Sequence, residues 1–359
     1  MTADYDVVVA GGGPGGTAAA ITLTRGGLKV ILIETRSAQE WKIGETLVPE
    51  SRQILQNLGV WESFVNDGHL PCYGNCSAWG TDQMLEKDFI FNPWGCGWQL
   101  DRARFEMMLL RASEKEGAVI LRGETVQDFK WWEGRWEIDL RERTVRSPWL
   151  IDATGRRAMV ARQMGKSRLI LDQLISIYVT ATSDTGADRD SRTFIESRPE
   201  GWWYIALMPN RRRTVGFQTD ADLIRDQDWR DPAWLQKRFC ETRHLAVLLE
   251  TQGYRFDAPA QITSAHSGRL EQCFGEGWLA VGDAAQSFDP LSGQGIFNAL
   301  ITGQKAAEAL LQDWPEANAG VMEYGTSMED RWAQFLQNRQ QNYLMEQTWK
   351  QLPFWLRRR

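Results

Sequence analysis

The first forty residues restrict the fold more than any other part of the chain, because a strand, a glycine-rich turn and a helix follow one another there. Residues 4–10 (DYDVVVA) form a short apolar run rich in valine, which is typical of a central parallel strand buried on both faces. A helix is expected over residues 15–25, ending at Gly26 and Gly27, and a second strand over residues 28–34 (LKVILIE). This βαβ order predicts an α/β fold.

The turn between strand and helix has the spacing Gly11-x-Gly13-x-x-Gly16, which is typical of a site for the diphosphate of a dinucleotide. Gly11 permits a tight turn, Gly13 lets a diphosphate approach the backbone, and Gly16 lets the helix pack closely on the strand. Glu34 ends the second strand 23 positions after Gly11, where a carboxylate can accept both ribose hydroxyls of an adenosine. The unit predicts binding of an ADP moiety without deciding between NAD and FAD. The alternative is a glycine-rich loop with a surface glutamate.

Composition and charge exclude several classes of protein. With 359 residues, 43% apolar and 25% charged, the chain has the composition of a globular protein large enough for two lobes. The net charge of −6 gives no general attraction for nucleic acid, and the basic clusters at residues 211–213 and 357–359 are interpreted as a solvated turn and a solvated tail. No apolar run approaches the roughly 18 residues of a membrane span, so an integral membrane protein is not expected.

The cysteine and histidine content bears on compartment and metals. Five widely spread cysteines do not describe a disulfide framework, and the N-terminus carries no secretion signal, so we expect a cytoplasmic protein. Cys72 and Cys76 would make half of a metal site. Since no second pair completes four ligands and the chain has three histidines, no metal site is expected.

Two kinds of hydrophobic pattern alternate along the rest of the chain. Apolar strands recur at residues 118–122 and 149–153, and alternation over residues 129–140 predicts an antiparallel hairpin that turns at Glu133 and Gly134. Long alternating stretches over residues 172–220 predict an antiparallel sheet. We therefore expect a discontinuous Rossmann-like nucleotide lobe with an inserted antiparallel substrate lobe and a C-terminal helical region. The boundaries are 1–68, 98–171 and 275–312 for the first, 69–97 and 172–274 for the second, and 313–359 for the third.

A second glycine-rich segment distinguishes between the dinucleotides. Residues 278–282 (WLAVG) predict another buried strand, followed by Asp283 and then by residues 289–295 (DPLSGQG), where a helix begins near Gly293. This segment resembles FAD-containing hydroxylases and halogenases with the para-hydroxybenzoate hydroxylase type of fold. The resemblance implies FAD as cofactor, with Asp283 on the ribityl chain. A helix that begins at Gly293 would direct N–H groups and positive potential at the flavin N1 and C2 carbonyl, which stabilises the anionic reduced flavin.

Two further segments extend this resemblance along the chain. Residues 152–157 (DATGRR) resemble the Asp-Gly motif of those hydroxylases, and Arg102 in LDRARFE matches their FAD-contacting arginine. Together with the first glycine turn, the resemblance implies that the cofactor is bound by Gly11, Gly13, Pro14, Gly16, Glu34, Arg36, Thr46, Arg102, Val126, Asp152, Gly155, Asp283, Pro290, Gly293 and Gly295.

A narrower resemblance concerns the substrate. Residues 42–49 (KIGETLVP) resemble a segment of flavin halogenases and geranylgeranyl reductases, and Lys42 and Glu45 within it are candidates for a catalytic acid or base, or for a plain ion pair. Residues 201–220 and the terminal LPFWLRRR are similar to the flavoprotein maturases of lysine and glycine oxidases. The partners of those maturases carry cysteine tryptophylquinone. Residues 202–207 (WWYIAL) lack the proline and the spacing of the Trp-x-Trp-x-Ile-Pro motif of halogenases, and this segment has no lysine for a halogenating amine.

These resemblances favour an FAD-dependent monooxygenase that uses O₂ to hydroxylate a tryptophan of a precursor quinoprotein oxidase during cofactor maturation. No second dinucleotide fold is visible, so NAD(P)H or another electron donor would act as a transient reductant. The alternatives are a small-molecule aromatic hydroxylase or halogenase, and a non-catalytic, flavin-stabilised binding chaperone. Trp202 and Trp203 either pack in the core or contact the substrate or the flavin.

Overall fold

The computed structural model describes residues 2–38 and 42–359. Its central element is a six-stranded sheet, in which every neighbouring pair is parallel except the pair at one edge. In spatial order the strands are β22 (Phe274–Gly275), β23 (Trp278–Ala280), β13 (Trp149–Asp152), β2 (Val7–Ala10), β3 (Val30–Glu34) and β9 (Val119–Arg122). Strands β2, β3 and β13 are buried along their whole length, as expected for the centre of a parallel sheet.

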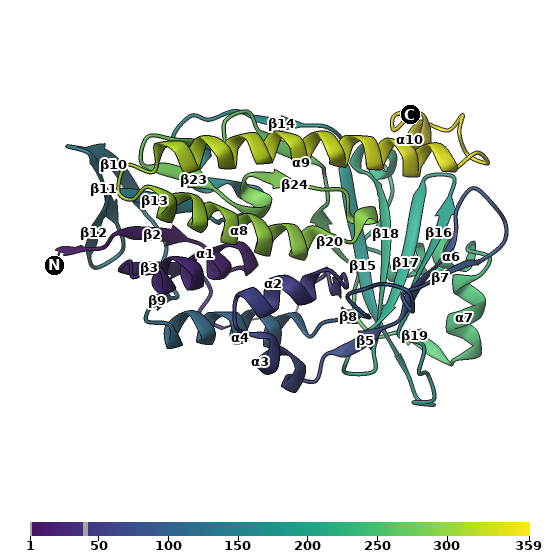
Figure 1. Cartoon of the computed structure of the whole chain (residues 1–359). Helices are drawn as coiled ribbons and strands as arrows, with labels where there is room; N and C mark the ends of the chain where they lie inside the picture. Colours follow the sequence, from purple (N-terminus) through teal and green to yellow (C-terminus); the bar gives the residue numbers. More distant parts are fainter. Residues whose placement is uncertain (1, 39–41) are drawn as a thin grey trace.

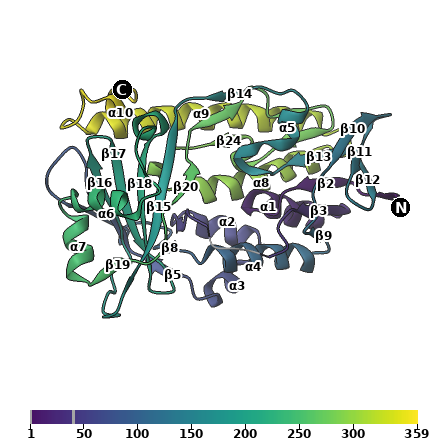
Figure 2. The same cartoon turned by 180° about the vertical axis from the view of Figure 1, so that it is seen from behind.

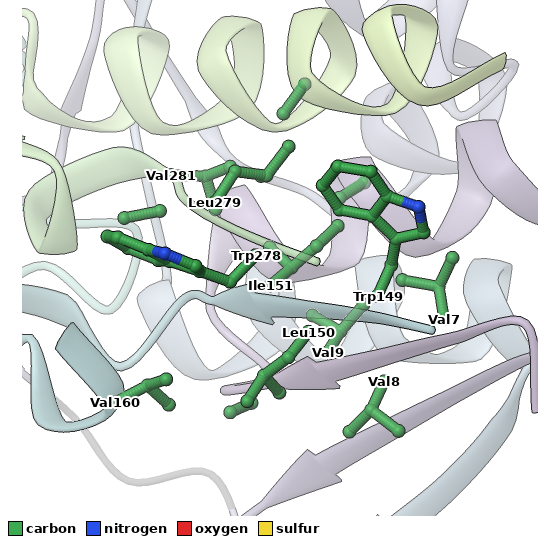
Figure 3. Packing of buried hydrophobic residues seen from close by; sticks show 14 of the residues in the cluster. Val7, Val8, Val9, Trp149, Leu150, Ile151, Val160, Trp278, Leu279 and Val281 are labelled. Atoms are coloured by element: carbon green, nitrogen blue, oxygen red, sulfur yellow. The ribbon is translucent and has the colours of Figure 1, made fainter. Parts of the chain in front are cut away.

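Helices cover one face of this sheet, and a separate small four-stranded sheet packs against the same hydrophobic core (Figure 1). The helices are α1 (Pro14–Arg25), α4 (Arg102–Lys115) and α8 (Gly295–Gln312). In Figure 3, valines of β2 and Leu150 and Ile151 of β13 lie in the same cluster as the rings of Trp149 and Trp278. The predicted α/β fold is confirmed, although α8 begins at Gly295, two residues after the predicted start.

The small sheet contains the predicted hairpin. Strands β10 (Asp128–Trp132) and β11 (Arg135–Asp139) meet at Glu133 and Gly134, whose φ angles of 48° and 76° are those of a type I′ turn. Strand β12 (Thr144–Ser147) follows, and β1 (Thr2–Asp4) pairs with it in parallel. The prediction of one strand over residues 4–10 is wrong, because the Asp6 carboxylate accepts the backbone N–H of Lys29 at 2.7 Å and the chain changes sheet there.

A larger sheet forms the second half of the molecule (Figure 2). Its central strands are antiparallel, as predicted, and β6 joins in parallel to β16. Its strands are β19 (Tyr254–Phe256), β15 (Leu174–Ser183), β18 (Arg213–Asp220), β17 (Gly201–Leu207), β16 (Thr193–Arg198), β6 (Gly74–Ala78) and β7 (Leu85–Asp88), with β20 (Gln261–Ser264) on β15. Helices α6 (Pro232–Cys240) and α7 (Leu245–Thr251), which the sequence patterns did not predict, pack on one face of this sheet.

Short elements connect the two halves. They comprise the sheet of β4 (Thr46–Leu47), β8 (Gly97–Gln99) and β5 (Leu70–Cys72), the sheet of β14 (Arg168–Ile170), β21 (Gly268–Leu270) and β24 (Gln286–Ser287), and helices α2 (Ser51–Asn57), α3 (Trp61–Asn66) and α5 (Met159–Gln163). The predicted domain boundaries stay predictions, but β6 and β7 do join the sheet formed by residues 172–220.

The C-terminal helix α9 (Asn318–Met345) runs along both halves in Figure 1, and the short helix α10 (Pro353–Leu356) follows it. Tyr324 of α9 belongs to the core of the six-stranded sheet, whereas Tyr343 packs with Trp202 of the larger sheet. The interpretation of both basic clusters as solvated is wrong at two positions, since Arg213 is 0% and Arg358 is 3% exposed. Each forms a buried ion pair, Arg213 with Asp188 and Arg358 with Asp220.

Candidate functional site

A cavity of about 670 Å³ is lined by residues of both halves of the molecule. The glycine turn before α1 and the start of α8 line it from the nucleotide half, and strands β15, β17 and β18 line it from the larger sheet. All the predicted cofactor residues line this cavity except Gly16 and Asp152, and the two catalytic candidates, Lys42 and Glu45, line it as well. The structure therefore brings together residues that lie far apart in the sequence.

The three motif glycines occupy different environments. A Cβ atom added to Gly11, which has φ +116°, would lie 2.3 Å from the carbonyl oxygen of Ala153, and one added to Gly16 would lie 1.9 Å from the carbonyl oxygen of Gly11. A Cβ added to Gly13, the N-cap residue of α1, would meet no atom within 4 Å in the part of the chain that the structure describes. Gly11 and Gly16 thus allow close packing of the chain, while the space at Gly13 is open for a diphosphate at a helix N-terminus.

Glu34 at the end of β3 holds the glycine turn in place. Its buried carboxylate accepts the backbone N–H of Gly12 at 2.8 Å and that of Arg36 at 2.9 Å. The side chain also lines the cavity, so the same carboxylate is available to ribose hydroxyls. Ribose binding by Glu34 stays a prediction.

Glu106 of α4 is a buried carboxylate that the sequence reasoning missed. It forms ion pairs with Lys42, with Arg102 at 2.5 Å and with Arg36 at 3.8 Å. Burial alone would raise the pKa of Glu106, but the charges of Arg102 and Lys42 lower it below its usual value. Burial, with a further contribution from Arg102, lowers the pKa of Lys42 to about 8. Lys42 thus pairs with Glu106 and not with Glu45.

This cluster leaves positive charge on the cavity wall. Three cations share Glu106, and one of them, Arg36, also pairs with Glu34 at 3.3 Å, so three positive charges face two carboxylates. Arg102 donates to the carbonyl oxygen of Gly44 at 2.6 Å, yet its buried Nε has no hydrogen-bond partner among the described residues. An unpaired buried donor and an excess of cations fit an anionic ligand such as a diphosphate. The i, i+4 spacing of Arg102 and Glu106 in LDRARFE is the one sequence signal that pointed to this pair.

Glu45 lies between the two halves of the molecule. Its buried carboxylate accepts hydrogen bonds from the Thr214 hydroxyl of β18 and from the backbone N–H of Gly44 at 3.2 Å. Burial raises the pKa of Glu45, against the opposing effects of the Thr214 hydrogen bond and of Arg102. A buried carboxyl group with a raised pKa on a cavity wall can keep its proton at a higher pH than an exposed carboxyl group, which suits proton transfer.

Asp283 and Asp152 differ in their relation to the cavity. Asp283 lines it and accepts a hydrogen bond from Arg156 Nε at 3.1 Å. Asp152 is fully buried and accepts the N–H and hydroxyl of Thr154 at 3.0 and 2.6 Å and the N–H of Ala161 at 3.0 Å. These contacts hold the turn before Gly155, so they support a structural role for Asp152 and give no support to direct contact with a cofactor.

The beginning of α8 offers free backbone donors to the cavity. Within residues 2–38 and 42–359 no side chain caps the helix at Gln294, and Gly295 and Ile296 line the cavity. The preceding Gly293 has φ +62°, a left-handed conformation that glycine adopts without strain. Unpaired N–H groups and the helix dipole make this end of α8 electropositive, which suits the N1 side of a flavin.

The larger sheet supplies an aromatic and polar wall. The strand register places Ser176, Gln218 and Trp202 in one row across β15, β18 and β17, and all three line the cavity. Tyr204, two residues after Trp202, lines it as well. Trp203 faces the opposite side, where it stacks on Phe217 in the core beneath α6 and α7. Core packing is thus confirmed for Trp203, whereas contact of Trp202 with the substrate or the flavin stays a prediction.

Among the described residues, no group of histidine, cysteine, aspartate and glutamate side chains is arranged to hold a metal ion. Within the same residues no helix is both long and apolar enough to span a membrane. All five cysteines are free thiols.

Comparisons with known proteins identify the family of the chain. Residues 4–313 match the family described as FAD binding domain. LodB of Marinomonas mediterranea, provisionally named an FAD-dependent oxidoreductase, is 28% identical over 99% of this chain and 96% of its own length. The 1H-pyrrole-2-carbonyl-[peptidyl-carrier protein] brominase of Pseudoalteromonas luteoviolacea is 27% identical over 86% of this chain and 79% of its own.

Solved structures share the fold at lower identity. The flavin-dependent halogenase CmlS has a TM-score of 0.87 at 23% identity and covers 99% of this chain, which covers 68% of CmlS. The peptidyl tryptophan dihydroxylase QhpG, described as essential for tryptophylquinone cofactor biogenesis, has a TM-score of 0.75 at 24% identity, with 99% and 79% covered. The open space at Gly13, the unpaired Arg102 donor and the uncapped α8 fit the cofactor of this family. The chain belongs to the FAD-binding domain family, and its cofactor is FAD.

Proposed function

We propose that this protein is an FAD-dependent oxygenase that hydroxylates the ring of a tryptophan within a precursor protein, during the formation of a tryptophylquinone cofactor. The observation that carries the proposal is that the FAD cradle and the aromatic wall of Trp202 and Tyr204 line one cavity. The likeness to QhpG, a peptidyl tryptophan dihydroxylase, supports the substrate class. The similarity to LodB supports the oxidoreductase chemistry.

When bound and reduced, FAD supplies the means to activate O₂, which the side chains of the protein cannot do themselves. In the overall reaction one oxygen atom of O₂ becomes the hydroxyl group on the ring, and the other leaves as water. The ring hydrogen is replaced, and two electrons and two protons come from NAD(P)H or another donor and from solvent. NAD(P)H would bind transiently.

The residues of the chain would bind FAD, orient the substrate ring and hold or transfer a proton. Gly13, Arg102 and Asp283 line the part of the cavity that fits the diphosphate and ribityl chain of FAD. Trp202 and Tyr204 would hold the substrate ring by aromatic contact and keep bulk water away from it. Glu45 would hold or transfer the proton at its carboxyl group, for which its burial and raised pKa suit it.

The rim of the cavity favours a protein substrate over a small molecule. Phe89 lines the cavity, and the next two residues, Ile90 and Phe91, are 79% and 94% exposed. The loop is held by the Phe89 N–H, which donates to Tyr73 O at 2.8 Å, and by Asn92, which donates to Glu50 at 3.1 Å. Large exposed apolar side chains next to a cavity-lining residue are typical of a surface that contacts another protein.

The experiment is co-expression of the protein with a tryptophylquinone oxidase precursor encoded nearby, followed by mass spectrometry of the precursor peptides. We expect a tryptophan of the precursor to gain oxygen with the wild-type protein and to gain none with the FAD-free variant Gly13→Val. A Phe91→Asp variant that retains FAD should modify the precursor more slowly. If wild type binds the precursor and reduces its FAD but adds no oxygen, the oxygenase proposal fails and the binding-chaperone alternative survives.

The second candidate function is halogenation of a small or carrier-bound aromatic compound, which the similarity to the brominase favours. Against it, Lys42 is the only lysine among the described residues that line the cavity, and its ammonium group pairs with Glu106. Incubation with bromide, O₂ and a reduced flavin source distinguishes the two functions. A bromide-dependent mass increase on a free aromatic compound would favour halogenation, whereas oxygen incorporation without halide would favour hydroxylation.

A further inference from the structure

Asp289 lies at the junction of the FAD cavity and helix α9. It precedes the short helical turn Pro290–Ser292, and its Oδ1 accepts the backbone N–H of Leu291 at 3.0 Å, which caps that turn. The side chain is buried, and the residue lines both the FAD cavity and a second cavity of about 560 Å³ bounded by α8 and α9. The segment that Asp289 holds leads directly to Gly293 and to the start of α8.

Two residues of α9 compensate the charge of this carboxylate. The hydroxyl group of Tyr343 donates to Asp289 Oδ2 at 2.8 Å, and Arg339 Nε lies 3.5 Å from the same oxygen. Arg339 also pairs with Asp172 at 3.1 Å. Burial raises the pKa of Asp289, but Arg339 and then Arg358 oppose this effect. One oxygen atom of the carboxylate, Oδ1, thus holds the turn, while the other, Oδ2, faces a hydrogen-bond donor and a cation.

The chain of contacts continues into the aromatic wall. Trp202, which lines the FAD cavity, donates its indole N–H to the Tyr343 hydroxyl at 3.2 Å. Tyr343 is fully buried, so this hydroxyl links the substrate wall to the FAD-lining turn without access to bulk solvent. Tyr343 of α9 therefore links Asp289 to Trp202 of β17, and both of these residues line the cavity.

We propose that Asp289 positions the turn that lines the FAD cavity, and that Tyr343 and Arg339 neutralise its carboxylate so that its charge does not oppose reduction of FAD. A negative charge next to a flavin destabilises the anionic reduced form, and this effect is large where water is excluded. Helix α9 thereby tunes the reduction potential of a cofactor that it does not cradle. The proposal depends on FAD binding in this cavity and does not depend on which substrate is modified.

The experiment measures the midpoint potential of bound FAD in purified variants, by equilibration with a dye of known potential. Asp289→Asn keeps the cap on Leu291, since asparagine is an equally good capping residue, and removes the charge. We expect its potential to rise. Tyr343→Phe and Arg339→Met leave the carboxylate less compensated, so their potentials should fall. A tenfold change in the reduction equilibrium, which is about 30 mV for a two-electron couple, is a realistic size for each shift.

Tyr324→Phe provides the matched control. Tyr324 is also a buried tyrosine of α9, but its hydroxyl donates to the neutral carbonyl oxygen of Ala280 at 2.8 Å, so its loss should leave the potential unchanged. In the Asp289→Asn background, Tyr343→Phe should cause no further fall. The proposal is overturned if all variants shift the potential in the same direction, if Tyr343→Phe lowers it equally with and without the Asp289 charge, or if Asp289→Asn cannot retain FAD. Should Arg339→Met fail to fold, the tyrosine variants alone decide the question.

Discussion

Gly13→Val is the most direct test of the cofactor site, because the structure separates its effect on folding from its effect on FAD. Gly13 has φ −75°, a value that any residue adopts, and a Cβ there would meet no atom of the described residues within 4 Å. The added side chain would project into the space that the diphosphate is predicted to occupy. By contrast, a Cβ at Gly16 would lie 1.9 Å from a backbone oxygen of the glycine turn, so Gly16→Ala must disturb the fold itself.

The expected magnitudes follow from these environments. Glycine is a better N-cap residue than valine, so the change lowers the free energy of unfolding by about 0.5 to 1 kcal/mol. Valine also restricts the unfolded chain, which raises that free energy by about 0.4 to 1 kcal/mol. The free energy of unfolding of the FAD-free protein should therefore change by less than about 1 kcal/mol. Steric overlap with the bound diphosphate should weaken FAD binding by about 1 to 3 kcal/mol, which corresponds to a roughly 5- to 150-fold higher dissociation constant.

Three measurements check this reasoning: the visible flavin absorbance of the purified variant, the dissociation constant of FAD by fluorescence titration, and urea unfolding of the FAD-free proteins. Gly13→Val should be nearly colourless and as stable as FAD-free wild type, while Gly16→Ala should unfold at a lower urea concentration. A yellow Gly13→Val protein with wild-type affinity would refute the assignment of the cradle. Loss of stability equal to that of Gly16→Ala would refute the claim that Gly13 borders open space.

Three other changes have defined outcomes. Glu45→Gln keeps a side chain that can accept from Thr214, so it should retain FAD but slow oxygen incorporation about 100-fold; an unchanged rate and pH profile would rule out a proton-transfer role. The folded-state pKa of Lys42 is about 8, below its ordinary 10.5, so between these pH values unfolding takes up a proton and the stability of the FAD-free protein rises with pH. Urea unfolding of Lys42→Met should lack that rise. Arg358→Met leaves a buried carboxylate partly unpaired and should cost about 3 kcal/mol in urea unfolding, whereas Arg357→Met, at a side chain 44% exposed, should cost less than about 1; equal losses would contradict the importance of burial.

The parts of the fold that could be predicted from the sequence depend on residues close together in the chain. The strand, glycine turn, helix and second strand follow within 34 residues, and a type I′ turn needs only Glu133 and Gly134. The predicted FAD-binding residues come from short motifs, and all of them line the cavity except Gly16 and Asp152. For Asp152 the reason is that a motif does not reveal whether a carboxylate points to a ligand or holds its own turn.

Arg213 and Arg358 could not be placed from the sequence, because their environment is set by pairing at long range. Asp188, the partner of Arg213, lies 25 positions away, and Asp220, the partner of Arg358, lies 138 positions away. A run of arginines looks the same whether it is solvated or paired. Burial of an arginine without a carboxylate partner costs free energy, so these arginines are buried only because the fold places a carboxylate beside each of them.

The places of the two adjacent tryptophans of β17 also depend on pairing at long range. In a strand, neighbouring side chains point to opposite faces, so only one of Trp202 and Trp203 can line the cavity. Both residues are apolar, buried and equally suited to either face, and the choice depends on how β17 pairs with β16 and β18. That register is fixed by the whole sheet and by helices α6 and α7, which cover the Trp203 face.

Helix α9 lies outside the region that matches the FAD-binding domain, since the match ends at residue 313 and the helix spans Asn318–Met345. The family pattern therefore explains the cradle but not the groups that compensate Asp289, which are Arg339 and Tyr343 of this helix. Because Tyr343 also receives the hydrogen bond of Trp202, a substrate that displaces the indole ring would alter the same hydroxyl that neutralises the FAD-lining turn. On this basis the reduction potential of FAD should respond to occupation of the aromatic wall, and Tyr343→Phe should abolish that response.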